Sequence, residues 1–122
     1  MVSSAGSDRE ISLFVYGSLK RAEAHHSELR GSPFVGEART AARFALRMIS
    51  GYPALVLGAR SIRGELFRIS LVHLVSLDAF EGEGYARSEI ALVDGRRVSA
   101  YLSRRPQQGF LLDADEWPVP LG

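Results

Sequence analysis

The stretch LFVYGSL at residues 13–19 decides the fold, because it joins an apolar strand directly to a glycine turn. A second stretch, LDAFEGEGYAR at residues 77–87, places Glu81 where a helix is expected to end against another turn. Successive backbone N–H groups in a turn of the first kind can converge on an anion. A set of donors at a strand end, with one carboxylate nearby, would suffice for proton transfer on a small acidic substrate.

Length and composition are those of one globular domain. The chain has 122 residues, 46% of them hydrophobic, which is enough to close a core without crosslinks. Because cysteine is absent, disulfides, thiolate nucleophiles and cysteine metal sites are excluded, which fits a cytoplasmic location. No apolar run approaches the ~20 residues of a membrane helix, and residues 1–10 lack the apolar core of a secretory signal. We therefore expect a soluble cytoplasmic protein without a membrane partner.

Basic and acidic residues are almost balanced. There are 15 of the first and 14 of the second, interspersed, for a formal net charge of +1. Such a chain has no broad electrostatic footprint for nucleic acid. The expected partner is a small molecule, and no pattern in the chain indicates an oligomeric state.

Turn residues divide the chain into short apolar segments. Residues 1–10 are mostly small and polar and are predicted to form a flexible lead-in. A single domain is predicted over residues 11–122, with a C-terminal tail from about residue 103. Strands are predicted at 11–16, 34–40, 43–49, 54–57 and 62–69, a short helix at 22–30, and a turn at 50–53.

A second helix is predicted after Ser70, which can cap its first turn. It closes near residues 78–80 and so delivers Glu81 at its C-terminal end. The slightly negative carbonyl end of this helix would help keep the Glu81 carboxyl protonated. Its predicted apolar face consists of Leu71, Leu74, Val75 and Leu77.

Asp94-Gly95 separates two strand-like runs, 88–93 and 96–102, and predicts a hairpin with a type I′ turn. Gly64, inside the strand at 62–69, marks either a bulge or a close backbone approach. Because short strands dominate and two short helices interrupt them, the predicted fold is α+β, built on a small, mostly antiparallel barrel.

Common catalytic and metal-binding patterns are not persuasive here. No Gly-x-Ser-x-Gly elbow accompanies the histidines, so a Ser-His-Asp assignment has little support. Adjacent His25 and His26 would point about 100° apart on a helix, which favours structural or surface roles over a metal site. His73 is interpreted as a boundary histidine, and the spacing at residues 82–84 is not that of a dinucleotide loop. We expect neither a metal nor a cofactor.

Glu81 is the remaining candidate for proton transfer. A carboxylate that moves protons at neutral pH needs a raised pKa, and the neighbouring Phe80 and Tyr85 can supply an apolar wall. Glu83, between two glycines, is expected to be exposed on the turn. A glutamate at a helix end can equally be a surface residue, so the residues alone leave that alternative open.

The ordered set of motifs from Leu13 to Leu102 resembles the gamma-glutamylcyclotransferase-like superfamily, including its plant avirulence-induced branch. The family pattern opens with a strand and Tyr-Gly-Ser/Thr-Leu, which is YGSL at residues 16–19 here. A lone YGSL would be a weak signal, whereas the ordered set is a strong one. The further matches are His26, Val35-Gly36, Tyr52-Pro53-Ala54, Gly64-Glu65-Leu66-Phe67, Leu77-Asp78, Glu81-Gly82, Tyr85 and Arg87.

The resemblance implies a mixed barrel flanked by helices, with a cavity at the YGSL loop. It implies that Glu81 is the catalytic acid and base. In such enzymes the free α-amine of a γ-glutamyl substrate attacks its own γ-carbonyl, expels the attached amine and closes 5-oxoproline. Intramolecular attack of this kind can reach effective molarities of roughly 10⁵ to 10⁸ M, so the protein needs to supply only proton handling and charge placement.

Roles for the other residues follow from that resemblance. The backbone N–H groups of Gly17, Ser18 and Leu19 would hold the α-carboxylate or polarise the carbonyl. Arg87 is expected to brace the turn through backbone carbonyls. The remaining pocket candidates are Tyr16, which could hydrogen-bond substrate, Tyr52 and Pro53 as a wall, and Tyr85 and Tyr101 near the mouth.

The chain departs from the family pattern in places that affect the pocket mouth. Ala22 replaces a glycine often found after the first loop, the stretch from Glu81 to Tyr85 is short, and the tail after Leu102 matches no family motif. Members of the superfamily act on γ-glutamyl amino acids, glutathione, γ-glutamyl amines or γ-glutamyl-protected intermediates, and no residue selects among them. The alternatives are a non-catalytic binding module for a small acidic ligand, and a structural partner that uses the Trp117 tail as an arm.

Overall fold

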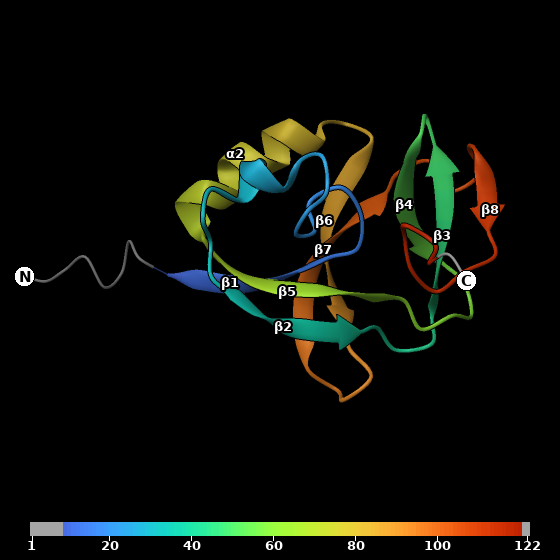
Figure 1. Cartoon of the computed structure of the whole chain (residues 1–122), viewed down its shortest axis with the longest axis horizontal. Coiled ribbons are helices and arrows are strands. Elements are labelled where there is room, and N and C mark those ends of the chain that lie inside the picture. Colours follow the sequence, from blue (N-terminus) through green and yellow to red (C-terminus); the bar gives the residue numbers. More distant parts are fainter. Residues whose placement is uncertain (1–8, 121–122) are drawn as a thin grey trace, which may run out of the picture.

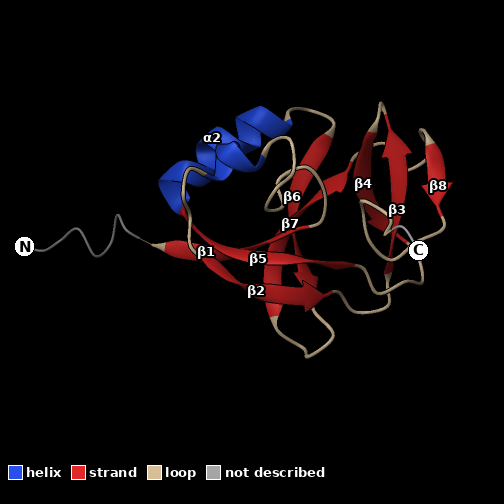
Figure 2. Ribbon diagram, viewed as in Figure 1, coloured by secondary structure: helices blue, strands red, loops and turns tan. Residues whose placement is uncertain are grey.

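The computed structural model describes residues 9–120, whose strands form one curled sheet with the α-helix lying across one end (Figures 1 and 2). Of the predicted lead-in, residues 1–8 lie outside the described residues, and the first strand begins at Glu10. The elements in chain order are β1 (Glu10–Val15), η1 (His26–Leu29), β2 (Phe34–Arg39), β3 (Phe44–Ile49), β4 (Tyr52–Leu57), β5 (Arg63–Ser70), α2 (Leu71–Glu81), β6 (Tyr85–Ala91), β7 (Arg97–Ser103) and β8 (Phe110–Leu112).

The sheet is mixed but mostly antiparallel, which confirms the predicted architecture in the form of a half-barrel. Its strand order is β2-β5-β1-β7-β4-β3-β8, and β6 pairs with β7 in addition. The β1–β7 and β4–β7 pairs are parallel, and the other strand pairs are antiparallel. A bridge between Thr40 and Leu92 joins the end of β2 to the end of β6, which curls the sheet toward closure.

β1 and β4 both pair with the same edge of β7, so neither of them runs along the whole of it. β6 pairs along the whole of the opposite edge of β7. On the shared edge, β1 places Leu13 beside Ser99, and β4 places Leu55 beside Leu102. The chain that leaves β1 after Val15 must therefore turn aside, because β4 occupies the next part of that edge.

The apolar run at the end of β1 is buried on both of its faces. Leu13 and Val15 belong to a cluster that includes Leu74 of α2, while Phe14 and Tyr16 belong to a second cluster inside the half-barrel. Alternate residues of a strand point to opposite faces, so a strand covered on both sides needs a continuous apolar sequence.

Helix α2 begins as its sequence predicts, but its buried stripe is narrower. The Ser70 hydroxyl accepts a hydrogen bond from the His73 N–H, which confirms the predicted cap. The helix extends through Glu81 before Gly82 ends it. The predicted four-residue apolar face is wrong, because the helix contacts the sheet along one line. Leu74 and Leu77 are buried, whereas Leu71 and Val75 are 38% and 71% exposed.

The predicted helix at residues 22–30 is also wrong. The chain turns there instead, and its helical part is the short 3₁₀ segment η1. Ala22 has φ of 67°, a left-handed conformation that glycine adopts at no steric cost and that interrupts a helix. This positive φ explains why the family pattern often has glycine at this position.

Two predicted turns differ in detail from the structure. At residues 50–53 the turn is confined to Ser50 and Gly51, and β4 begins at Tyr52. The hairpin between β6 and β7 is confirmed, but its turn is not type I′. That type needs positive φ at both central residues, and of the Asp94-Gly95 pair only Gly95 has it, with φ of 90°. A three-residue loop with Gly95 in the left-handed region connects the strands instead.

The chain after Ser103 packs on its own domain. β8 pairs with β3, and Trp117 lies against the core cluster inside the half-barrel. Arg60 forms ion pairs with Asp113 and Asp115 of this segment. The segment after Ser103 therefore packs against and pairs with strands of its own domain.

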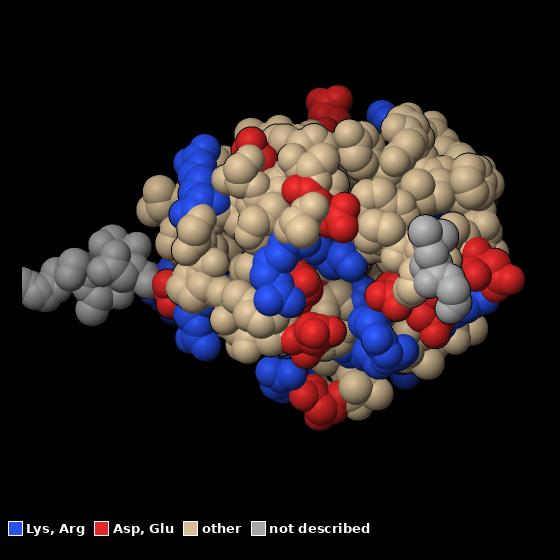
Figure 3. All heavy atoms as spheres, viewed as in Figure 1, with Lys and Arg blue, Asp and Glu red and all other residues tan. Residues whose placement is uncertain are grey.

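Surface charges are mixed on the face drawn in Figure 3, where basic and acidic side chains lie side by side. Within residues 9–120, no helix is both long enough and apolar enough to cross a membrane.

Gly64 is the site of a close backbone approach, one of the two predicted possibilities. A methyl group built on it would meet the Val15 carbonyl oxygen and would lie 2.6 Å from the Phe14 ring. Since both neighbours belong to β1, the absence of a side chain at Gly64 lets β5 and β1 approach at the point where β1 ends.

We expect Gly64→Ala to lower the free energy of unfolding by about 1–3 kcal/mol, because backbone atoms of β1 would have to move. Gly84→Ala is the matched control, since the nearest atom to its new methyl group would be Arg105 Nη1 at 3.8 Å. Urea denaturation of both variants measures the difference. Equal stability of the two variants would show that the backbone of β1 at Val15 can shift at little cost in free energy.

Candidate active site

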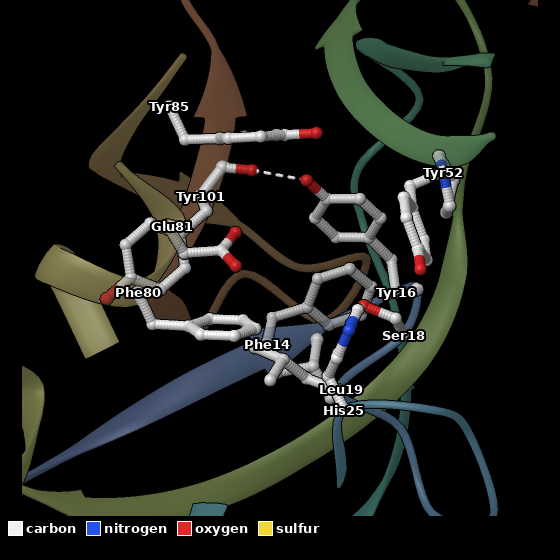
Figure 4. Close-up of a pocket in the computed structure, with 13 residues that line it drawn as sticks. Phe14, Tyr16, Ser18, Leu19, His25, Tyr52, Phe80, Glu81, Tyr85 and Tyr101 are labelled. Carbon is white, nitrogen blue, oxygen red and sulfur yellow. Dashed lines mark hydrogen bonds between the residues drawn. The ribbon is translucent and has the colours of Figure 1, made fainter. Parts of the chain in front are cut away.

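A cavity of about 190 Å³ lies where β1 ends, between the last turn of α2 and the start of β4 (Figure 4). It brings together the residues that the sequence singled out from segments far apart in the chain. Those residues are Tyr16, Gly17, Ser18, Leu19, Tyr52, Pro53, Glu81, Tyr85 and Tyr101. The rest of the lining consists of Phe14, Val15, His25 and Phe80.

The YGSL loop lines this cavity, and its backbone N–H groups at residues 17–19 are not used within the described chain. Gly17 and Leu19 are buried, and within residues 9–120 the N–H groups of Gly17, Ser18 and Leu19 donate to no protein acceptor. Buried N–H groups without a partner are rare in proteins, because each costs free energy comparable to a lost hydrogen bond. The loop is therefore suited to bind an anion or a polarised carbonyl oxygen.

Gly17 fixes how closely the loop approaches β4. A methyl group at Gly17 would lie 2.7 Å from Cγ of Pro53, so the proline ring packs directly on the glycine backbone. This contact holds the start of β4 against the loop as one wall of the cavity.

Two histidines in the turns that follow form hydrogen bonds with the same loop. The His25 N–H donates to the Ser18 carbonyl, and His25 Nδ1 lies 2.9 Å from Ser18 Oγ. His26 Nδ1 lies 2.9 Å from the Leu19 carbonyl oxygen. The two adjacent histidines thus contact two successive loop residues, and these contacts favour turns over a helix in this segment.

Glu81 ends α2 and points its carboxyl group into the cavity, toward Tyr16 (Figure 4). Burial raises the pKa of Glu81 to about 7. A carboxyl group with this pKa is present in both protonation states near neutral pH, so it can accept a proton and return it. Glu83 is exposed and lines a different cavity, which shares Tyr85 and Tyr101 with the first.

The Tyr16 hydroxyl already has a partner within the protein. It donates a hydrogen bond of 2.6 Å to the backbone carbonyl of Tyr101, and burial raises the pKa of Tyr16 well above its usual value. Tyr16 therefore supports the cavity wall with its proton engaged, so toward a ligand it can act only as an acceptor.

Asp78, Arg87 and Tyr101 form a network behind Glu81. Arg87 contacts both oxygens of the Asp78 carboxylate, at 3.0 and 3.1 Å, and the Tyr101 hydroxyl donates to Asp78 at 2.6 Å. The Arg87 guanidinium holds the pKa of Asp78 below its usual value, while burial raises the pKa of Tyr101. The prediction that Arg87 braces the turn through backbone carbonyls is wrong, since its partner is this carboxylate.

The sequence missed His25 as a residue of the cavity lining. Its ring centroid lies 5.3 Å from that of Tyr52 and 5.3 Å from that of Phe80. The pair His25-His26 carried no signal for this position. The path of the chain to His25 depends on the left-handed conformation of Ala22, which the sequence does not reveal.

Metal binding has no support among the described side chains. Within residues 9–120, no group of three or more His, Asp or Glu side chains is placed to hold a metal ion. The cavity combines one carboxyl group of raised pKa, that of Glu81, with the imidazole ring of His25 and the backbone of the YGSL loop.

Comparisons with known proteins find similar chains and a similar fold. The family described as gamma-glutamyl cyclotransferase, AIG2-like, matches residues 13–118. The gamma-glutamylcyclotransferase family protein YtfP of Escherichia coli K12 is 30% identical over a match that covers 86% of this chain and 94% of the relative. Its Citrobacter rodentium counterpart is 31% identical, with coverage of 86% and 93%. The crystal structure of an AIG2-like protein from Mus musculus, 22% identical, superposes with a TM-score of 0.79 over 89% of this chain and 88% of that one.

The buried carboxyl group makes stability depend on pH. Because the pKa of Glu81 is raised in the folded protein, folding is favoured while the group is protonated, and stability falls as pH rises from about 4.5 to about 7. We expect Glu81→Gln to unfold like wild type at pH 4 and to be more stable than wild type at pH 8, by roughly 2–3 kcal/mol.

Chemical denaturation at several pH values measures this difference. Glu83→Gln is the matched control, because it removes a carboxylate from an exposed position on the turn that follows α2. Its stability should follow that of wild type across the pH range. A Glu81→Gln variant that is no more stable than wild type at pH 8 would show that the carboxyl group is solvated.

Proposed function

Because the chain belongs to the gamma-glutamyl cyclotransferase, AIG2-like family, we propose that it converts a γ-glutamyl amine or γ-glutamyl amino acid into 5-oxoproline and the free amine or amino acid. The relatives named as gamma-glutamylcyclotransferase family proteins support this class of activity. The observation that carries the proposal is the Glu81 carboxyl group, partly buried and directed into a cavity whose opposite wall is the YGSL loop.

Binding places the γ-glutamyl group between the loop and Glu81. One anionic or partly negative oxygen of the substrate, from the α-carboxylate or the γ-carbonyl, accepts hydrogen bonds from the backbone of residues 17–19. Tyr16 and Pro53 form walls around the carbon chain. The substrate then folds back on itself, so that its α-amine approaches its own γ-carbonyl carbon.

The reaction requires one proton to be carried between two nitrogen atoms. As the α-amine nitrogen forms its bond to the γ-carbonyl carbon, Glu81 in its ionised form takes a proton from that nitrogen. When the bond from the same carbon to the leaving nitrogen breaks, Glu81 returns the proton to the leaving nitrogen. No water is consumed, and the products are 5-oxoproline and a neutral amine.

The raised pKa suits both halves of this cycle. A carboxyl group with an ordinary pKa would be a weaker base toward the attacking amine, and at neutral pH almost none of it would be protonated. A pKa of about 7 keeps Glu81 close to the working pH in either direction.

We expect wild-type protein to release 5-oxoproline from at least one compound in a panel of γ-glutamyl amines, γ-glutamyl amino acids and glutathione. Glu81→Gln should lose at least about a hundredfold in kcat/KM, because proton transfer by a placed group contributes that much or more. Chromatographic measurement of 5-oxoproline provides the readout, and thermal unfolding verifies that the variant is folded.

Glu83→Gln serves as the control, since its side chain lies outside the cavity and should leave the rate near that of wild type. Equal rates for wild type and Glu81→Gln would remove Glu81 from the proposed role. Binding of γ-glutamyl compounds without any turnover would favour a binding module instead.

The pH dependence of kcat/KM gives an independent measurement. The attacking α-amine must be uncharged and Glu81 must be ionised, so kcat/KM should fall about tenfold per pH unit below the α-amine pKa of ~8 and about a hundredfold per pH unit below a pKa of about 7. His25 also lines the cavity, so His25→Asn, which keeps a hydrogen-bonding atom near Ser18, is the matched variant. The steeper limb, below a pKa of about 7, should persist in His25→Asn. Its disappearance there would assign the titrating group to the histidine.

A further inference from the structure

The small volume of the cavity determines where the leaving amine must lie. A space of about 190 Å³ accommodates a group of roughly the size of an amino acid, and the γ-glutamyl part takes that place under the proposed function. Because Glu81 must reach the leaving nitrogen, the amine emerges next to Glu81. The residue beside it at the end of α2 is Phe80, which is 39% exposed and lines the same cavity.

An aromatic row borders the cavity on this side. It consists of Phe80, His25 and Tyr52, with the His25 ring centroid 5.3 Å from each of the other two (Figure 4). The three rings come from α2, from the turns after the YGSL loop and from the start of β4. Tyr52 is 42% exposed, so both ends of the row keep ring surface open to solvent.

His25 is held in the middle of this row. Its backbone N–H and its ring Nδ1 both contact Ser18, at 2.9 Å each. These contacts fix the ring relative to the loop that is proposed to bind the γ-glutamyl group. The middle ring of the row is therefore prearranged, and a ligand that stacks on it need not order that ring first.

No basic side chain within residues 9–120 lines the cavity beside the row. Among the described residues that line the cavity, none is lysine or arginine, and Glu81 is the sole aspartate or glutamate. Arg21, close to the loop in sequence, is bonded to Glu65 and stacks on Phe34. A carboxylate held among these lining residues would therefore lack a cationic partner, and an ammonium group held there would have to compete for the Glu81 carboxyl group.

We propose that the preferred substrate releases an amine with an uncharged aromatic body, which stacks on the row formed by Tyr52, His25 and Phe80. This inference rests on the proposed function and specifies its substrate class. Aromatic pairs favour offset or edge-to-face contacts with centroids ~4.5–7 Å apart, the spacing that the row itself already shows. An arylalkylamine can place its ring there while its nitrogen stays beside Glu81.

A panel of four related compounds tests the proposal. γ-Glutamyl-phenethylamine is compared with γ-glutamyl-butylamine, which lacks the ring, with γ-glutamyl-phenylalanine, which adds a carboxylate, and with γ-glutamyl-putrescine, which carries an ammonium group. Release of 5-oxoproline gives kcat/KM for each. We expect the phenethylamine compound to exceed each of the others by roughly threefold to tenfold, as one or two aromatic contacts imply.

Variants then assign any preference to the row. Phe80→Leu and Tyr52→Leu keep apolar surface at exposed positions, so folding should be retained, and thermal unfolding verifies this. Each should reduce the ratio of kcat/KM for the phenethylamine compound to that for the butylamine compound toward unity. Val75→Ala is the matched control on the same helix, 71% exposed and outside the cavity lining, and should keep the wild-type ratio.

The outcomes separate this inference from the proposed function. Release of 5-oxoproline from all four compounds with no aromatic preference would overturn the inference and leave the activity established. A preference for the phenylalanine or putrescine compound would replace it with a charged leaving group. An aromatic preference that survives in both Leu variants would place the ring elsewhere. No release from any γ-glutamyl compound would overturn the proposed function, and the inference with it.

Discussion

The shared edge of β7 is the constraint on which the rest of the structure depends. β1 and β4 both pair in parallel with that edge, one after the other, so β1 has to end where β4 takes its place. The chain leaving β1 turns aside at Tyr16, and its next N–H groups are left without strand partners. A topology of this kind produces a ligand site at the point where neighbouring strands diverge, as in open parallel sheets. Gly64 and Gly17 permit it, because β5 and Pro53 approach the same turn more closely than a side chain would allow.

Tyr101 connects the two halves of the candidate site. Its backbone carbonyl accepts a hydrogen bond from the Tyr16 hydroxyl. Its own hydroxyl donates a hydrogen bond to Asp78, which lies about one turn before Glu81 in α2. Arg87 contacts the same carboxylate from β6. A partly exposed ion pair adds little to stability, typically ~0–1 kcal/mol. The value of this one is geometric, because it fixes the last turn of α2 relative to the loop and so fixes the distance across the cavity.

Most features set by neighbouring residues could be predicted from the sequence, the turn type at Asp94-Gly95 being an exception, whereas features set by distant contacts could not. The Ser70 cap and the β6–β7 hairpin each depend on a few adjacent residues. The path of residues 22–30 depends on a left-handed Ala22 and on hydrogen bonds from His25 and His26 to the YGSL loop, which no local pattern reveals. For the same reason Glu81 and the loop could be found through their motifs, whereas His25 could not. Arg87 was identified as a brace, yet its partner lies on another element and could not be read from Arg87 itself.

The position of Glu81 shows how stability and chemistry oppose each other in this fold. Burial raises the pKa of the carboxyl group, and the same burial disfavours the folded state once the group is ionised. An exposed carboxylate at this helix end would avoid that cost, but with an ordinary pKa it would be a weaker base toward the attacking amine. Burial of Glu81 raises its pKa, which is the property that the proposed reaction needs. Because the rings that line the cavity continue through Phe80 to His25 and Tyr52, the surroundings of the carboxyl group extend into the surface on which the leaving amine is proposed to stack.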